Sequence, residues 1–245
     1  IWTVGQADRS ASEFALAPDR FRDFLANDFG YEDKYFLVGH SVPAADFPYV
    51  LPGPADTWGG TWPTSGWRTH QVNILFGLKE IPSDGTCTLV VDLLDYAKNF
   101  LPLVKVSVNT QDAKFQLDAP GLCVADQRKP NQMEKIVDTL SITGNLAKAT
   151  PRRLEIPIRP GVLKAGGNEV TITVLEGSWI LFDRVSLEGP AGTNVEQPQQ
   201  LFIRNIEAAP MNWPTANDAS SPCWSISNGS KAHPRSASNS TTKRY

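Results

Sequence analysis

The strongest constraint on the fold is a regular alternation of apolar and polar side chains in short segments. In residues 69–78, every second position shares one face: His70, Val72, Ile74, Phe76 and Leu78. Successive side chains of a β-strand point to opposite faces, so this spacing predicts a strand with one buried face. The pattern recurs in five further segments: Cys87–Leu93, Leu103–Asn109, Leu154–Ile158, Glu169–Leu175 and Trp179–Glu188. Its repetition predicts an all-β chain.

Turn residues separate these segments and favour a β-sandwich. The chain contains 18 glycines and 19 prolines, and they gather at residues 82–85, 160–161 and 166–168, between the predicted strands. Short strands divided by such turns are typical of two packed sheets. The main helical signal follows Pro18, where Asp19 caps a short helix with Phe21, Phe24 and Leu25 on one apolar face. We therefore expect a sandwich with a short N-terminal helix.

The C-terminal part of the chain differs from the rest in composition. Residues 215–245 contain no Leu, Val, Phe or Met, and 17 of these residues are Ser, Thr, Asn, Gly or Pro. Such a segment buries too little apolar surface to offset the entropy of ordering it. We therefore predict a domain over residues 1–190, an extra strand and linker over 191–214, and a disordered or non-native tail over 215–245.

Charge, hydropathy and cysteine count exclude several classes of partner. A net charge of −3 gives no basic footprint for nucleic acid or for an anionic membrane surface. No apolar stretch approaches the ~20 residues that a membrane span needs. The three cysteines, Cys87, Cys123 and Cys223, are too few for a disulfide scaffold and lack CxxC zinc spacing. Cys87 shares the parity of its strand's apolar residues, which favours a buried thiol over a bridge to Cys123.

A cluster of aromatic residues is the main candidate for a binding site. Three of the seven tryptophans lie within ten residues of one another, with a tyrosine before them and an arginine after them: Tyr49, Trp58, Trp62, Trp67 and Arg68. Sugar rings stack their C–H faces on indoles, and an arginine can pair with a uronate carboxylate. The alternative is that these indoles close the open end of the sandwich. We assign the five residues as candidate carbohydrate-binding residues.

Two further polar residues have both a structural and a functional interpretation. His70 shares its face with Val72 and Ile74, which favours a hydrogen-bonded core histidine over a catalytic base. Asp183 alternates with Leu181 and Val185 and is expected to point inward, where a carboxylate must be hydrogen-bonded, paired or metal-bound. Backbone amides or an arginine would satisfy it. Calcium, with oxygens from Asp8 or Glu13, is the alternative, and we assign no metal or cofactor.

Residues near both ends of the chain resemble one family. The opening segment, residues 1–14, and two closing segments, residues 167–174 and 177–190, are similar to the C-terminal β-sandwich domain of rhamnogalacturonan lyases, the family 4 polysaccharide lyases. This resemblance implies a jelly-roll fold of the galactose-binding or carbohydrate-binding-module type, joined in such enzymes to a catalytic domain. Residues 51–62 depart from the family, so a related carbohydrate-active enzyme is also a candidate parent.

The resemblance and the aromatic cluster lead to three functional hypotheses. The first is a non-catalytic module of a secreted or periplasmic enzyme that degrades pectic, rhamnogalacturonan-like glycans, with a polysaccharide or oligosaccharide and the catalytic domain as partners. The second is a structural domain that supports the catalytic domain and binds no sugar. The third is a small lyase or glycosidase, for which only Arg68 and His70 lie suitably close in sequence. No catalytic residue is assigned.

Overall fold

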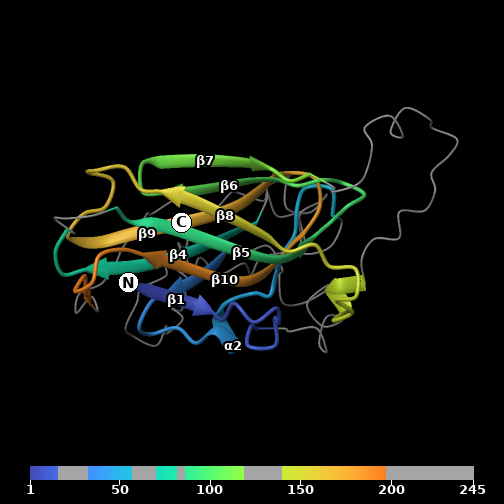
Figure 1. The fold of residues 1–245 in the computed structure, drawn as a ribbon, viewed down its shortest axis with the longest axis horizontal. Helices are drawn as coiled ribbons and strands as arrows, with labels where there is room; N and C mark the ends of the chain where they lie inside the picture. The colour runs from blue at the N-terminus through green and yellow to red at the C-terminus, as the bar shows by residue number, and fades with distance from the viewer. Residues whose placement is uncertain (16–32, 57–69, 82–85, 119–139, 197–245) are drawn as a thin grey trace, which may run out of the picture. The chain divides into compact units, whose positions relative to one another are not determined.

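The described strands of the protein form two β-sheets around one core. A computed structural model describes residues 1–15, 33–56, 70–81, 86–118 and 140–196 (Figure 1). All of them belong to one unit, Ile1–Gln197. None of the helices within these ranges is long and apolar enough to cross a membrane. The predicted helix after Pro18 and the predicted tail, 215–245, lie outside the described residues.

The first layer is called here the β10 sheet. Its strands, in spatial order, are β1 (Trp2–Gly5), β10 (Ile180–Glu188), β5 (Thr88–Tyr96) and β8 (Arg152–Pro157). The two-residue strand β3 (Val50–Leu51) also pairs with β10. All of these pairings are antiparallel.

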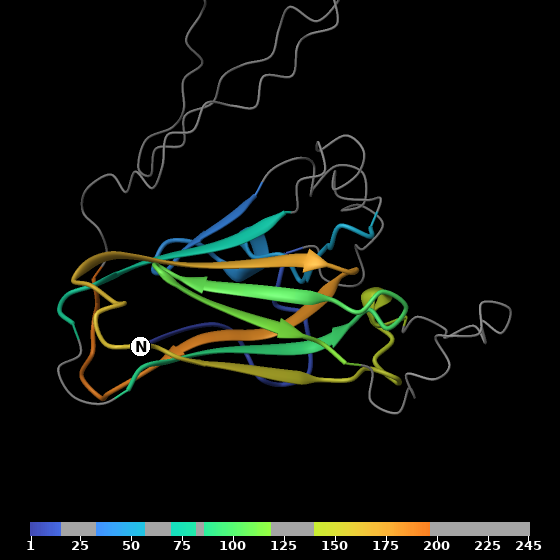
Figure 2. The same ribbon diagram turned by 90° about the horizontal axis from the view of Figure 1, so that it is seen from above.

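The second layer, the β9 sheet, lies opposite the first (Figure 2). Its strands, in spatial order, are β11 (Val195–Glu196), β4 (Gln71–Leu78), β9 (Gly166–Glu176), β6 (Leu103–Val108) and β7 (Gln111–Gln116). Strand β2 (Lys34–Leu37) pairs with β4 in the parallel direction. The prediction of an all-β sandwich is therefore confirmed.

The core fills the space between the two sheets. The inward residues of β4 are fully buried, as the alternation predicted: Val72, Ile74, Phe76 and Leu78. Trp2 of β1 packs against Phe76 across the layers, with ring centroids 5.3 Å apart. Toward β2 and β3, Phe47 contacts three further rings: Phe14, Phe36 and Phe182. These aromatic contacts join the N-terminal segment and both sheets.

Strand β4 differs from the expected half-buried strand. Its opposite face is buried as well, and Asn73 on that face has no exposed surface. The Asn73 carboxamide accepts a hydrogen bond from the Thr171 hydroxyl at 3.0 Å and donates to the Lys34 carbonyl at 3.4 Å. Alternation indicates where polar side chains lie, but a polar side chain can be buried when its neighbours satisfy its hydrogen bonds.

Cys87 is a buried free thiol immediately before β5, as its parity predicted. Burial raises its pKa, and the positive charge of the Ile1 amino group opposes that shift. A raised pKa leaves little thiolate at neutral pH, so Cys87 is a packing residue and not a nucleophile.

Candidate functional site

Four connecting segments meet at one end of the sandwich, called here the loop end. Residues 53–56, 97–102, 117–118 and 177–179 are joined there by backbone hydrogen bonds: Ala55 N to Gly177 O, Ala97 N to Trp179 O, Ser178 N to Phe100 O and Leu117 N to Pro102 O. Loops fixed to a rigid scaffold in this way commonly carry binding residues.

The two residues that flank the segment 57–69, Asp56 and His70, are both buried. Asp56 accepts hydrogen bonds from the Gly53 amide at 2.8 Å and from the Ser178 hydroxyl. His70 is 2% exposed and directly precedes Gln71, which pairs with Thr173 of β9. Its burial agrees with the interpretation of His70 as a core histidine.

The structure places only one of the five predicted carbohydrate-binding residues. Trp58, Trp62, Trp67 and Arg68 lie outside the described residues. Tyr49 is completely buried, and its hydroxyl donates a hydrogen bond of 2.9 Å to the Ile142 carbonyl. A ring without exposed surface offers no face to a sugar, so we remove Tyr49 from the candidate set.

Asp95 fixes another part of the loop end from inside the protein. Its fully buried carboxylate accepts hydrogen bonds from the Lys98 ammonium at 2.9 Å, the Ser141 hydroxyl at 2.6 Å and the Thr150 amide at 2.9 Å. A buried carboxylate with three donors, one of them charged, is a stable anchor. Asp95 therefore ties Ser141 and Thr150 to the end of β5.

Asp183 lies at an irregularity in β10 that the alternation did not reveal. Phe182 pairs with Leu93 and Arg184 pairs with Asp92, so Asp183 is an extra residue on its strand. Such a bulge changes which side chains face the core, and here Phe182 reaches the Phe47 ring. The expected burial of Asp183 is confirmed, since it is 7% exposed, although this bulge interrupts the regular alternation with Leu181 and Val185.

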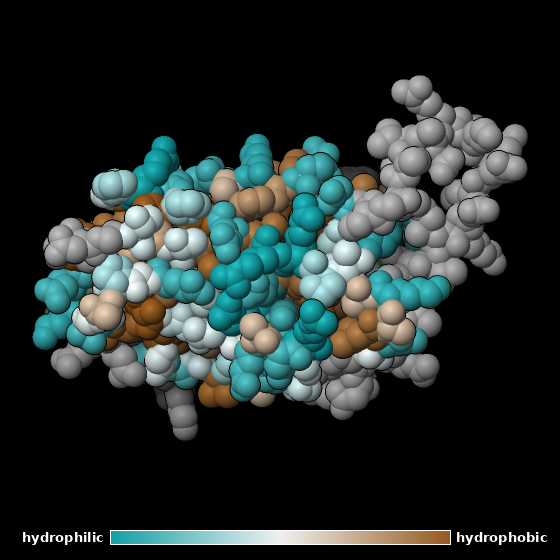
Figure 3. Space-filling view, viewed as in Figure 1, coloured by the Kyte–Doolittle hydropathy of each residue, from teal (hydrophilic) through white to brown (hydrophobic). Residues whose placement is uncertain are grey.

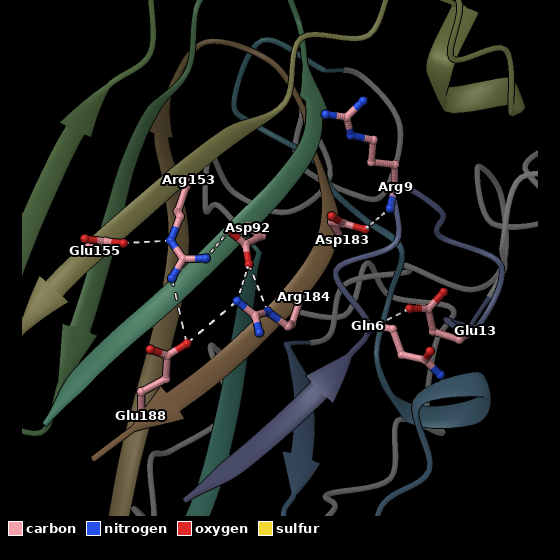
Figure 4. A network of polar contacts seen from close by, with 9 residues as sticks. All are labelled: Gln6, Arg9, Glu13, Asp92, Arg153, Glu155, Asp183, Arg184 and Glu188. Atoms are coloured by element: carbon pink, nitrogen blue, oxygen red, sulfur yellow. Dashed lines mark hydrogen bonds and ion pairs between the residues drawn. The ribbon is translucent and has the colours of Figure 1, made fainter. Parts of the chain in front are cut away.

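A backbone amide satisfies the Asp183 carboxylate, as the structural interpretation expected. The Arg9 amide donates a hydrogen bond of 3.0 Å to it (Figure 4), and the side chain is 7% exposed. Burial raises the pKa of Asp183, the Arg9 amide opposes this shift, and the nearby Asp8, Asp92 and Glu13 carboxylates raise the pKa further. In the part of the chain that the structure describes, no group of three or more metal-ligating side chains occurs.

A network of charged side chains covers part of the β10 sheet (Figures 3 and 4). Asp92 receives the Arg184 guanidinium at 2.8 Å and lies 3.5 Å from that of Arg153. Arg153 also pairs with Glu155 at 2.7 Å, and both guanidinium groups approach Glu188. The network contains two guanidinium groups and three carboxylates, so its net charge is −1 and it offers no excess positive charge to an anionic ligand.

A groove lies between the last strands of the two sheets, β7 and β8. Its volume is about 460 Å³, and residues 114–117 and 152–154 line it. The groove brings Lys114 of β7 together with the adjacent Arg152 and Arg153 of β8, which are distant from Lys114 in the sequence. Sequence reasoning did not identify this site, since the pairing of two sheet edges leaves no local sequence pattern.

Comparison with known proteins assigns the family. The family model described as "CBM-like: Polysaccharide lyase family 4, domain III" matches residues 1–187. The chain belongs to this family. The match confirms the resemblance to the C-terminal domain of rhamnogalacturonan lyases, and it agrees with the two-sheet fold of this CBM-like domain.

Other comparisons contribute little to this assignment. No curated protein matches the chain. One similar solved structure is described as a family GH115 4-O-methyl-α-glucuronidase with specificity for decorated arabinogalactans. It shares 14% sequence identity with this CBM-like domain at a TM-score of 0.24. The match covers 50% of this chain and only 14% of that enzyme.

Proposed function

We propose that this CBM-like domain is a non-catalytic module that helps a polysaccharide-degrading enzyme to engage pectic, rhamnogalacturonan-like glycans. In this proposal the catalytic domain of the parent enzyme is its partner, and the enzyme is secreted or periplasmic. Family membership over residues 1–187 is the observation that carries the proposal.

The described residues on either side of the tryptophan segment support a site at the loop end. The segment with Trp58, Trp62, Trp67 and Arg68 follows Asp56 and precedes His70 in the sequence, and both of these flanking residues are buried. Asp56 is also hydrogen-bonded to the Gly53 amide at the loop end. In the proposed site the indoles stack on sugar rings and Arg68 pairs with a uronate carboxylate.

The described residues offer less support for the other two hypotheses. Their large exposed apolar side chains are Tyr35, Val42, Ile81 and Phe100. Four such side chains among the described residues are few for an apolar docking face that a catalytic domain would cover. A lyase would also require a cation and a base, but the buried His70 presents no accessible base at its position.

Glycan titration of the pure protein tests the proposal. We expect rhamnogalacturonan or homogalacturonan to change the tryptophan fluorescence and to release heat in a calorimeter. Trp58→Ala, Trp62→Ala or Trp67→Ala should weaken binding about tenfold for each indole that stacks on the glycan. Trp224→Ala, which removes an indole from the predicted tail, is the control and should bind like the wild type.

Two outcomes would replace this proposal with an alternative. A protein that binds none of the acidic or neutral glycans would favour the structural domain. An increase in ultraviolet absorbance from an unsaturated product, when the pure protein is incubated with pectic substrates, would favour a lyase.

A further inference from the structure

The groove between β7 and β8 is a built feature of the sandwich edge. Among the described strands, β7 pairs only with β6 and β8 pairs only with β5, so each presents an unpaired edge (Figures 1 and 2). Unpaired strand edges expose backbone donors and acceptors that can bind a ligand.

Polar contacts hold the two edges together on both sides of the groove. At one end, the Gln111 carboxamide donates a hydrogen bond of 2.8 Å to the Pro157 carbonyl and accepts one of 2.9 Å from the Arg159 amide. At the other end, Arg152 pairs with Asp118 at 3.1 Å. The Gln111 contacts therefore fix the distance between the edges at one end of the groove, whereas the exposed Arg152–Asp118 pair holds the other end only weakly.

The groove combines an apolar floor with cationic walls. Leu117 and Leu154 are almost completely buried, Phe115 is partly exposed, and all three line the groove. Lys114 and Arg152 stand beside this floor from opposite strands. A volume of about 460 Å³ lies in the range of small-ligand sites, roughly 300–1,000 Å³.

Lys114 and Arg152 are more available to a ligand than Arg153 is. Arg153 is held by Asp92, Glu155 and Glu188. Lys114 forms no ion pair with any residue that the structure describes. Arg152 is 43% exposed, and its partner Asp118 is 66% exposed. Ion pairs at this exposure contribute little free energy, so a ligand carboxylate can take the place of Asp118.

We infer that the β7–β8 groove binds a uronate unit of an acidic glycan. Lys114 and Arg152 would hold the carboxylate, and the Phe115 ring would contact the apolar face of the sugar. This inference rests on the proposed function and adds a second candidate subsite, built from other residues than those of the tryptophan segment. Because the groove is cationic, we expect the protein to prefer acidic to neutral glycans, and we expect this preference to decrease as the ionic strength rises.

Charge-removing variants of the full chain test the groove, with an oligogalacturonide and a neutral galactan as the two probes. We expect Lys114→Gln and Arg152→Gln each to weaken oligogalacturonide binding about tenfold and to leave galactan binding unchanged. Lys105→Gln is the matched control, because Lys105 lies on the adjoining strand β6, is paired with Asp112 and does not line the groove. Amide chemical shifts of residues 114–117 and 152–154 should change on addition of the oligogalacturonide.

Each outcome separates this inference from the proposed function. Unchanged oligogalacturonide binding in both groove variants, with no shift changes at these amides, would overturn the groove and leave the proposed function intact. Binding of the neutral galactan alone would also overturn the groove, but would keep the module a carbohydrate binder. Absence of binding to every glycan would reject the proposed function together with the groove. Thermal unfolding of each variant confirms that it is folded.

Discussion

The four buried carboxylates among the described residues differ in how well they are stabilised, and Asp92 is paired with two arginines. Asp95 has three hydrogen-bond donors, including an ammonium group, and Asp56 has a backbone amide and a hydroxyl. Asp183 accepts a hydrogen bond from one backbone amide and has other carboxylates nearby. Asp183 is thus the residue at which an ionised carboxylate costs stability.

We predict that Asp183→Asn stabilises the protein at neutral pH. The pKa of Asp183 is raised in the folded state, so protonation of this carboxyl group stabilises the fold. This stabilisation is fully present below the unfolded pKa of 3.8 and is lost as the pH rises through the folded pKa. The asparagine carbonyl keeps the hydrogen bond from the Arg9 amide without the charge. Urea denaturation should show a variant more stable than the wild type at pH 7, with a smaller difference at pH 3.

Asp112→Asn provides a control of opposite sign. Hydrogen bonds from Ser107 and Lys105 lower the pKa of this exposed carboxylate. Its ionised form therefore stabilises the fold above the unfolded pKa, and that contribution is lost as pH falls. We expect a slight destabilisation at pH 7 that disappears in acid. A change of the same sign in both variants would contradict the assignment of these pKa shifts.

At the level of strands, sequence alternation predicted most of the fold but missed the groove. The segments assigned to β4, β5, β6, β8, β9 and β10 all contain strands in the structure. Strand β7 was missed because Ala113 and Phe115 are its only inward apolar residues, and neither is fully buried. The Asn109–Thr110 turn before it, with φ of 49° at Asn109, was the available signal of a hairpin.

Irregular and long-range features could not be read from alternation at all. The extra residue Asp183 in β10 changes the facing of its neighbours, and no local pattern marks it. Likewise, the groove requires the edge of β7 to face that of β8, which only the packing of the two sheets determines. The candidate tryptophans were identified by composition, and their role remains a prediction.

The loop end depends on one close approach between two of its turns. Gly177 has φ of +81°, and a Cβ atom there would overlap the Leu101 carbonyl oxygen and lie 2.7 Å from that of Phe100. Gly161 has nearly the same φ, +80°, but a Cβ atom there would have no other atom within 4 Å. A comparison of alanine substitutions at these two glycines therefore separates the free-energy cost of the left-handed backbone conformation from that of the steric overlap at Gly177.

We predict that Gly177→Ala destabilises the protein much more than Gly161→Ala. The control should lose about 1–2 kcal/mol, the cost of a left-handed conformation for a residue with a side chain. Gly177→Ala should lose about 1–3 kcal/mol more, because the new methyl group forces the two turns apart. Chemical denaturation measures both values, and equal losses would show that the turns can separate without cost.

At the scale of the whole chain, charge is distributed unevenly along the sequence. Residues 215–245 carry four basic residues and one acidic residue, a net charge of +3, whereas the chain as a whole has −3. Residues 1–214 are therefore more acidic than the net charge of the whole chain indicates. The cationic groove is a local exception within this acidic part of the chain. We expect salt to screen the four basic residues of the predicted tail, so that the groove carries the preference for acidic glycans.

We predict that removal of residues 215–245 leaves both the unfolding temperature and the affinity for an oligogalacturonide unchanged. The segment has too few apolar residues to contribute to a core, and the family match ends at residue 187. Calorimetry of the shortened and full chains measures both quantities at two salt concentrations. A lower unfolding temperature would mean that the tail packs on the domain. Weaker binding at an unchanged unfolding temperature would assign part of the affinity to the charge of the tail, and the effects of Lys114→Gln and Arg152→Gln would then have to be measured in the shortened chain.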